Sequence, residues 1–219
     1  MLNEILEQIF PTTCGMCGKI TKESLCNKCK NKINKEIICK MQIKYINGEF
    51  VKYMYLFKYE SELRRIMLSY KFKEKVYLYE FFVKIILKNE KLYNFLKKYD
   101  IIIPVPLNYK KLKHRGYNQC ELISSEIARN VENLHSYNDI LIKAKNNLRQ
   151  SSLSLEHRQE NVKNAYIIKN LEKNKLEIKD KNILIFDDIC TTMSTINECT
   201  KVLQKLEPKS IGVVTIFRD

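Results

Sequence analysis

The chain has 219 residues, a net charge of +14 and an apolar content of 45%. These values suit a folded domain with a hydrophobic core and exclude an intrinsically disordered chain. The longest uncharged apolar run is too short to span a membrane, and the first ten residues lack the basic start of a secretory signal. We therefore expect a cytoplasmic protein without a membrane span.

The positive charge is concentrated in the middle of the chain. Residues 61–150 contain 18 basic and 9 acidic side chains, so they supply +9 of the total. Such an excess favours a polyanionic partner, through counterion release and electrostatic steering. A lysine-rich solvated surface is an equally good explanation from charge alone.

The N-terminal part carries two pairs of cysteines with the spacing of a metal site. Cys14 and Cys17 form one CxxC motif, and Cys26 and Cys29 form a second after eight intervening residues. Two such turns can complete a tetrahedral Zn²⁺ site. Because four thiolates close the coordination shell, we expect a structural zinc ion. Unrelated free cysteines are the alternative.

The pattern divides the chain into three parts. We expect a zinc-binding module over residues 1–40 and a connecting, hood-like segment over residues 41–99. The stretch "ESELRRIMLSYKF" in that segment predicts an amphipathic helix. Its apolar stripe consists of Leu63, Ile66 and Met67.

Strands and helices alternate over residues 100–219. "IIIPVP" predicts a strand that its prolines end, and the next helix has Asn118 and Glu121 as a capping box. "NILIF" predicts a strand buried on both faces; a helix capped at Thr195 and the strand "SIGVVTIF" follow. We therefore expect an α/β fold, with helices flanking a parallel sheet.

A basic block, "YKKLKHRGY", covers residues 109–117. Cations between aromatic residues suit single-stranded nucleic acid, because the charges follow the phosphates and the rings stack on the bases. The same residues suit a pyrophosphate group equally well. A solvated loop with inward-packed tyrosines is the alternative.

Two adjacent carboxylates, Asp187 and Asp188, follow the strand "NILIF" and precede the loop "TTMST". In open parallel sheets, ligands bind at the carboxyl ends of strands, and the N-terminus of the following helix attracts anions. The loop can surround a phosphate while the carboxylates reach vicinal hydroxyls or a hydrated Mg²⁺. A sugar phosphate therefore suits this segment better than a plain turn and helix cap.

Three blocks resemble known families. "ILIFDDICTTMST" resembles the phosphoribosyl-pyrophosphate (PRPP) signature of the type I phosphoribosyltransferases. "IIIPVPLNYKKLKHRGYNQCELIS" and "LRQSSLSLEHRQENVKNAY" are similar to two blocks of the ComF competence family. The resemblance covers nearly the whole chain and implies a phosphoribosyltransferase-like domain over residues 100–219.

The resemblance also implies ligands and partners. It implies PRPP or a related phosphosugar with Mg²⁺, and a role in natural transformation, in the handling of imported single-stranded DNA. A competence-machinery protein, such as a helicase or recombination protein, is a further partner that it implies.

Residue roles follow from the same resemblance. Asp187 and Asp188 would contact the ribose hydroxyls, directly or through Mg²⁺. The residues of the PRPP loop would be Thr191, Thr192, Met193, Ser194 and Thr195. The residues facing the pyrophosphate would be Lys113, Arg115 and Gly116. Arg149 and Arg158 would lie in the hood loop.

Met193 stands where the family pattern has glycine. Glycine there would allow a positive φ and a close approach of the backbone to phosphate. A methionine in that geometry costs about 1–3 kcal/mol.

Three functions therefore stay open. The first is a PRPP-binding protein of natural transformation, and the second is an active phosphoribosyltransferase that transfers ribose 5-phosphate to a base or amine. The third is a zinc-containing basic nucleic-acid module with a vestigial pocket. No residue is assigned to catalysis.

Overall fold

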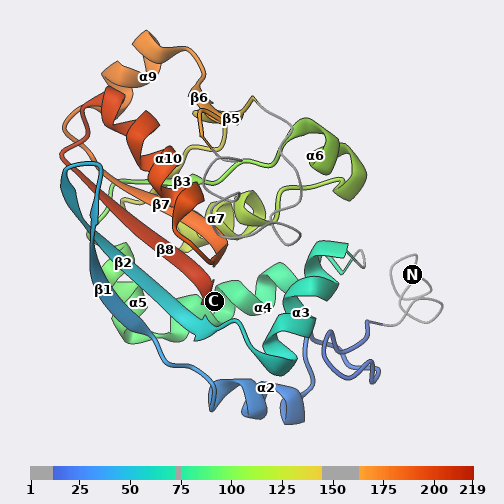
Figure 1. The fold of residues 1–219 in the computed structure, drawn as a ribbon. Coiled ribbons are helices and arrows are strands. Elements are labelled where there is room, and N and C mark those ends of the chain that lie inside the picture. Colours follow the sequence, from blue (N-terminus) through green and yellow to red (C-terminus); the bar gives the residue numbers. More distant parts are fainter. Residues whose placement is uncertain (1–11, 73–74, 145–162) are drawn as a thin grey trace.

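A computed structural model describes residues 12–72, 75–144 and 163–219 (Figure 1). Its centre is a six-stranded sheet in the order β1-β2-β8-β7-β3-β4. The strands are β1 (Lys40–Ile46), β2 (Glu49–Lys58), β3 (Ile101–Pro104), β4 (His135–Ser136), β7 (Asn182–Cys190) and β8 (Ser210–Arg218). All neighbours run parallel except β1, which is antiparallel to β2. The expected α/β fold with a mostly parallel sheet is confirmed.

Helices cover both faces of this sheet (Figure 1). The helices on one face are α3 (Ser61–Phe72), α4 (Leu78–Lys88), α5 (Glu90–Leu96) and α7 (Gln119–Asn130). The helices on the other face are α9 (Leu171–Ile178) and α10 (Ser194–Leu203). The remaining elements are α2 (Asn27–Asn34), α6 (Tyr109–Arg115), the 3₁₀ turn η2 (Gln204–Leu206), and a small sheet of β5 (Leu141–Lys143) and β6 (Tyr166–Ile168).

Strand β7 is buried on both faces, as its continuous apolar run predicts. Leu184 and Phe186 belong to the core beneath α3, α4 and α7. Ile183 and Ile185 belong to the opposite core, which includes the apolar stripe of α10. The two cores hold the end of β7 in a fixed position, and that end carries the acidic pair.

Helix boundaries differ in detail from the sequence expectations. Asn118 caps α7 as predicted, and its side chain accepts a hydrogen bond of 3.1 Å from the Cys120 N–H. The helix ends at Asn130, because Val131 adopts an extended backbone. The cap predicted at Thr195 is wrong, since α10 begins at Ser194 and has Met193 at its cap position.

Residues 40–58 form two strands of the main sheet, which the sequence analysis did not predict. Strand β2 pairs in parallel with β8, so the middle part of the chain shares a sheet with the C-terminal part. The division at residues 40 and 99 stays a prediction. The helix expected from "ESELRRIMLSYKF" is present as α3, with its apolar stripe buried. Over the described ranges, every helix is too short or too polar to cross a bilayer.

Candidate functional site

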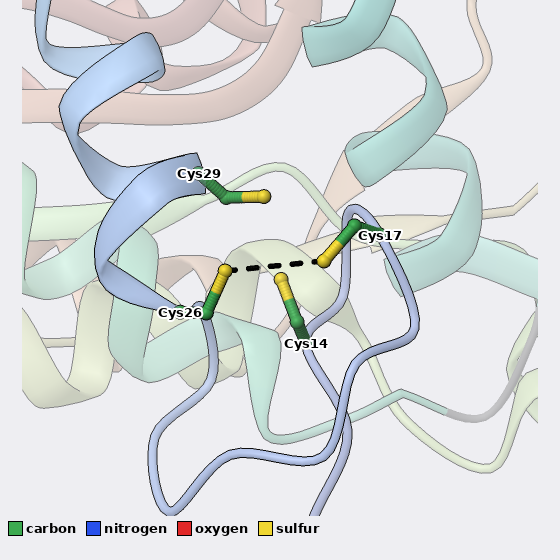
Figure 2. A group of neighbouring side chains, drawn as sticks. All are labelled: Cys14, Cys17, Cys26 and Cys29. Carbon is green, nitrogen blue, oxygen red and sulfur yellow. Dashed lines mark hydrogen bonds between the residues drawn. The ribbon is translucent and has the colours of Figure 1, made fainter.

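The four cysteines expected to bind zinc lie together (Figure 2). Cys14 and Cys17 come from a turn, whereas Cys26 and Cys29 lie at the start of α2. Their four sulfur atoms are within 4.8 Å of one another, and Cys17 Sγ and Cys26 Sγ are 3.9 Å apart. A tetrahedral site with Zn–S bonds of about 2.3 Å needs sulfurs about 3.8 Å apart. The cluster could therefore hold a zinc ion after a small contraction.

The local backbone prepares this cluster for a cation. The Gly18 N–H donates to the Cys14 carbonyl at 2.9 Å, and Gly18 has a φ of +75°, which closes the first CxxC turn. Burial raises the pKa of the Cys14 thiol, but hydrogen bonds from the backbone at Cys17 and Cys26 outweigh this effect and lower the pKa to about 6. Burial raises the pKa of Cys29. Metal binding would therefore have to displace a proton from Cys29, whereas the lowered pKa of Cys14 favours its thiolate form.

The acidic pair, Asp187 and Asp188, lies near the C-terminal end of β7. Its two carboxylates have different surroundings. Asp187 lines a small pocket together with residues 189–196. Its Oδ1 accepts a 2.8 Å hydrogen bond from the Asp188 N–H and lies 3.6 Å from Cys120 Sγ. Burial, followed by the negative charge of Asp188, raises the pKa of Asp187 to about 7.

Asp188 is only 3% exposed, and its side chain lies on the face of the sheet that α3 and α7 cover. Its carboxylate forms an ion pair with Lys71 of α3 and accepts a 2.6 Å hydrogen bond from Gln119 Nε2 of α7. The two predicted metal ligands are adjacent in the sequence, but of the two only Asp187 lines the pocket.

The loop after β7 brings its predicted residues together around that pocket. The lining includes Thr191, Thr192, Met193, Ser194 and Thr195. Thr192 Oγ1 and Ser194 Oγ are 2.7 Å apart, and Met193 has a φ of +63°. The loop therefore adopts the left-handed backbone that a glycine would favour, with a side chain present.

Helix α6 carries the residues predicted to face the pyrophosphate. It ends at Gly116, which has a φ of +80°, and Lys113 lies exposed on it. The Arg115 guanidinium donates to the Gln119 side chain and lies 5.1 Å from the centroid of the Phe72 ring. Arg115 is thereby linked through Gln119 to the acidic pair. Arg149 and Arg158 lie outside the described residues.

Sequence reasoning missed four polar residues of this region. They are Lys71, Gln119, Lys143 and Arg218. The guanidinium of Arg218 donates to the carbonyls of Cys190, at 3.2 Å, and Thr191, which fixes the start of the loop.

Lys143 is a cation of β5 near the pocket. Burial lowers the pKa of Lys143, the charge of Lys111 lowers it further, and Asp187 acts in the opposite direction. Its ammonium group donates to the Tyr166 hydroxyl at 3.0 Å.

A signal for Lys71 and Gln119 was present in the sequence. Lys71 follows Leu63 and Met67 at four-residue spacing, so it continues a buried stripe of α3. Gln119 precedes Ile123 and Ile127 at the same spacing on α7. A polar residue on an otherwise apolar helix face needs a buried partner, and here both find Asp188.

Comparison with known proteins agrees with this geometry. The family model for the phosphoribosyl transferase domain matches residues 120–219. The chain is 37% identical over 123 residues to Competence protein F of Haemophilus influenzae, which covers 56% of this chain and 52% of that protein. These matches support a ComF-family protein with a phosphoribosyltransferase-like domain. The resemblance predicted from the sequence blocks is confirmed.

A second relative is DNA utilization protein YhgH of Escherichia coli O157:H7, at 30% identity over 121 residues, or 54% of this chain and 49% of the other. The chain spans about half the length of these curated relatives.

Solved structures with partial similarity are phosphoribosyltransferases. A hypoxanthine phosphoribosyltransferase from Staphylococcus aureus matches 64% of this chain and 65% of its own, at 16% identity and a TM-score of 0.40. A purine phosphoribosyltransferase from Pyrococcus horikoshii matches 64% and 82%, at 17% identity and a TM-score of 0.33. The family assignment rests on the sequence matches.

Proposed function

We propose that this ComF-family protein binds PRPP or a related phosphosugar, with Mg²⁺, at the carboxyl end of β7. The observation that carries the proposal is the hydroxyl-lined loop, which closes a pocket beside Asp187 directly before α10. Such a position offers backbone N–H groups and the positive end of a helix dipole to an anion.

In this proposal, different residues of the chain bind different parts of the ligand. The hydroxyls of Thr191, Thr192, Ser194 and Thr195 hold the 5′-phosphate. Asp187 faces the ribose hydroxyls, while Lys113, Arg115 and Gly116 face the pyrophosphate. Lys143 adds a cation near Asp187, and Arg218 keeps the loop in place through its carbonyls.

Oxygen donors of this kind suit Mg²⁺, which neutralises the pyrophosphate when it is bound. Asp187 fits as a ligand, because it lines the pocket and its Oδ1 accepts a hydrogen bond from the uncharged Asp188 N–H. Asp188 fits only if its carboxylate is released from Lys71 and Gln119.

A change of Thr192 to Val tests the phosphate loop. The variant removes the hydroxyl that pairs with Ser194 but keeps the branched shape of the side chain. We expect PRPP to bind at least about tenfold more weakly by calorimetry, because hydrogen bonds to charged groups contribute about 1.5–3 kcal/mol. Thr21→Val, in the cysteine-rich part, is the matched control and should bind as the wild type does. Unchanged PRPP affinity in Thr192→Val would show that the loop does not bind the phosphate.

We also propose that the protein handles single-stranded DNA during natural transformation. The two curated relatives are named for competence and DNA utilization. An open cleft beside the cysteine cluster supports the proposal, because its charged lining is mostly basic. The cations are Lys19, Lys22, Lys28, Lys32 and Arg65. Contact with a helicase or recombination protein stays a prediction.

Fluorescence anisotropy with a labelled oligothymidine tests the cleft. Lys22→Ala combined with Lys28→Ala should weaken binding and flatten its dependence on salt, since fewer counterions are released. If the double variant and the wild-type protein bind with equal affinity and equal salt dependence, the DNA does not bind at this cleft. Turnover is a separate question, and pyrophosphate release in a screen of bases and amines would identify an active phosphoribosyltransferase.

A further inference from the structure

Lys71 places its ammonium group on the carboxylate of Asp188. Lys71 Nζ lies 2.9 Å from Oδ1 and 2.8 Å from Oδ2, so both oxygens share the one cation. The Lys71 side chain is 15% exposed and the Asp188 side chain 5% exposed. Removing one partner of such a buried pair leaves an uncompensated charge, which costs far more than breaking a surface pair.

A second group holds Asp188 from the side of α7. Gln119 Nε2 donates to Oδ2 at 2.6 Å, and the Gln119 side-chain oxygen accepts from Arg115. The Gln119 carbonyl accepts a 3.1 Å hydrogen bond from the Tyr70 hydroxyl of α3. Helices α3 and α7 therefore fix each other and the carboxylate between them.

The same carboxylate belongs to a group of three side chains with metal-binding atoms. Cys120, Asp187 and Asp188 bring one such atom each within 4.8 Å of the others. Because Lys71 engages both oxygens of Asp188, its ammonium group competes with a divalent cation for this carboxylate, and the two positive charges repel at close range in a site shielded from water.

We propose that Lys71 is the resident counter-ion of the acidic pair, and that a divalent cation reaches Asp188 only when Lys71 withdraws. The inference deepens the proposed function, on which it rests in assigning a cation to this pair. Lys71 is then a positioning residue, which sets how tightly the site holds a metal and keeps α3 attached to β7 when no metal is bound.

Mn²⁺ alone, titrated into the zinc-loaded protein and followed by its electron paramagnetic resonance signal, tests the proposal without PRPP. Lys71→Met should bind Mn²⁺ at least tenfold more tightly than the wild type, because the competing cation is gone. Adding Asp188→Asn to that variant should abolish the gain. Lys173→Met is the control: it removes a lysine from an exposed ion pair with Glu177 and should leave Mn²⁺ affinity unchanged.

Wild-type Mn²⁺ affinity in a folded Lys71→Met variant, judged by circular dichroism and zinc content, would overturn the proposal. If that variant does not fold, Lys71→Gln takes its place: it keeps a hydrogen-bond donor for Asp188, lacks the charge and carries the same expectation. A failure here concerns Lys71 only. The phosphosugar proposal is tested separately, by PRPP binding to the wild-type protein.

Discussion

Met193 holds the left-handed backbone of the loop at a φ of +63° and a ψ of −4°. Its sulfur lies 3.0 Å from Cys190 Sγ, and its side chain packs against the core that contains Ile196. That packing offsets part of the strain, which for a non-glycine residue is about 1–3 kcal/mol. Because the loop already has this geometry in the free protein, the strain lowers the free energy of unfolding and does not weaken ligand binding.

Replacing Met193 with Gly tests where the strain acts. We expect the affinity for PRPP to change less than about threefold, since neither backbone has to rearrange on binding. If instead the loop has to move, the 1–3 kcal/mol released would tighten binding by roughly 5- to 150-fold. Calorimetry on Met193→Gly and on Met193→Ala, which keeps the Cβ, distinguishes the two outcomes. A large gain in Met193→Gly alone would contradict our account.

Helix α7 is the element that delivers polar groups to the acidic pair. Its first turn carries Gln119 and Cys120, and Asn118 fixes the start of that turn. The Asn118 side chain also donates to the Val105 carbonyl at 3.2 Å, which ties the helix to the end of β3. A small error in the position of this turn would move Gln119 away from Asp188.

Asn118→Ala should therefore affect both stability and binding. We expect the free energy of unfolding to fall by about 1–2 kcal/mol, as for a lost helix cap, and PRPP affinity to fall at least threefold. Asn89→Ala is the control, because Asn89 caps α5 in the same way, accepting from the Leu92 N–H at 3.0 Å. It should lose similar stability and keep its affinity. Urea unfolding and calorimetry measure the two quantities, and equal PRPP affinity in both variants would contradict the role of α7.

Elements with a clear local period were predictable from sequence. Helices α3, α7 and α10 show apolar stripes, and β3, β7 and β8 show short apolar runs. Strand β2 was missed, and it pairs with β8, from Lys52 opposite Gly212 onward. No local pattern reveals a partner so distant in sequence.

The candidate site divides in the same way. Its ligand loop and acidic pair follow one strand and could be located from the sequence, whereas Lys71 reaches Asp188 from a helix 117 residues earlier. Its place on an apolar stripe marks it as buried but does not identify its partner. The conformation of Met193 likewise depends on its contact with Cys190 and on its packing against the core, which sequence spacing does not specify.

At the scale of the whole molecule, the cysteine cluster is part of the main core. Cys14 and Cys29 belong to the same buried cluster as α3 and α4. A Cβ on Gly15 would lie 2.3 Å from Leu78 Cδ2, and the Tyr77 hydroxyl donates to the Thr13 carbonyl at 2.8 Å. The cysteine turn and α4 therefore pack too closely to unfold independently.

Removing zinc should accordingly destabilise the entire protein. We expect one zinc ion per chain by elemental analysis, and a drop in Tm of about 10 °C or more after chelation, since the free energy of metal binding contributes to folding. The loss should appear as a single transition shifted to lower temperature. Cys17→Ser should reproduce it, whereas Cys39→Ser, outside the cluster, should not. An unchanged Tm after complete loss of zinc would show that the metal is not structural.

The central claim is that the pocket at the end of β7 binds a phosphosugar. Its most direct test is isothermal titration of the zinc-loaded wild-type protein with PRPP, with and without Mg²⁺. We predict saturable binding that is markedly tighter with Mg²⁺. Absence of binding up to millimolar PRPP under both conditions would contradict the claim and leave the basic cleft beside the cysteines as the leading functional site.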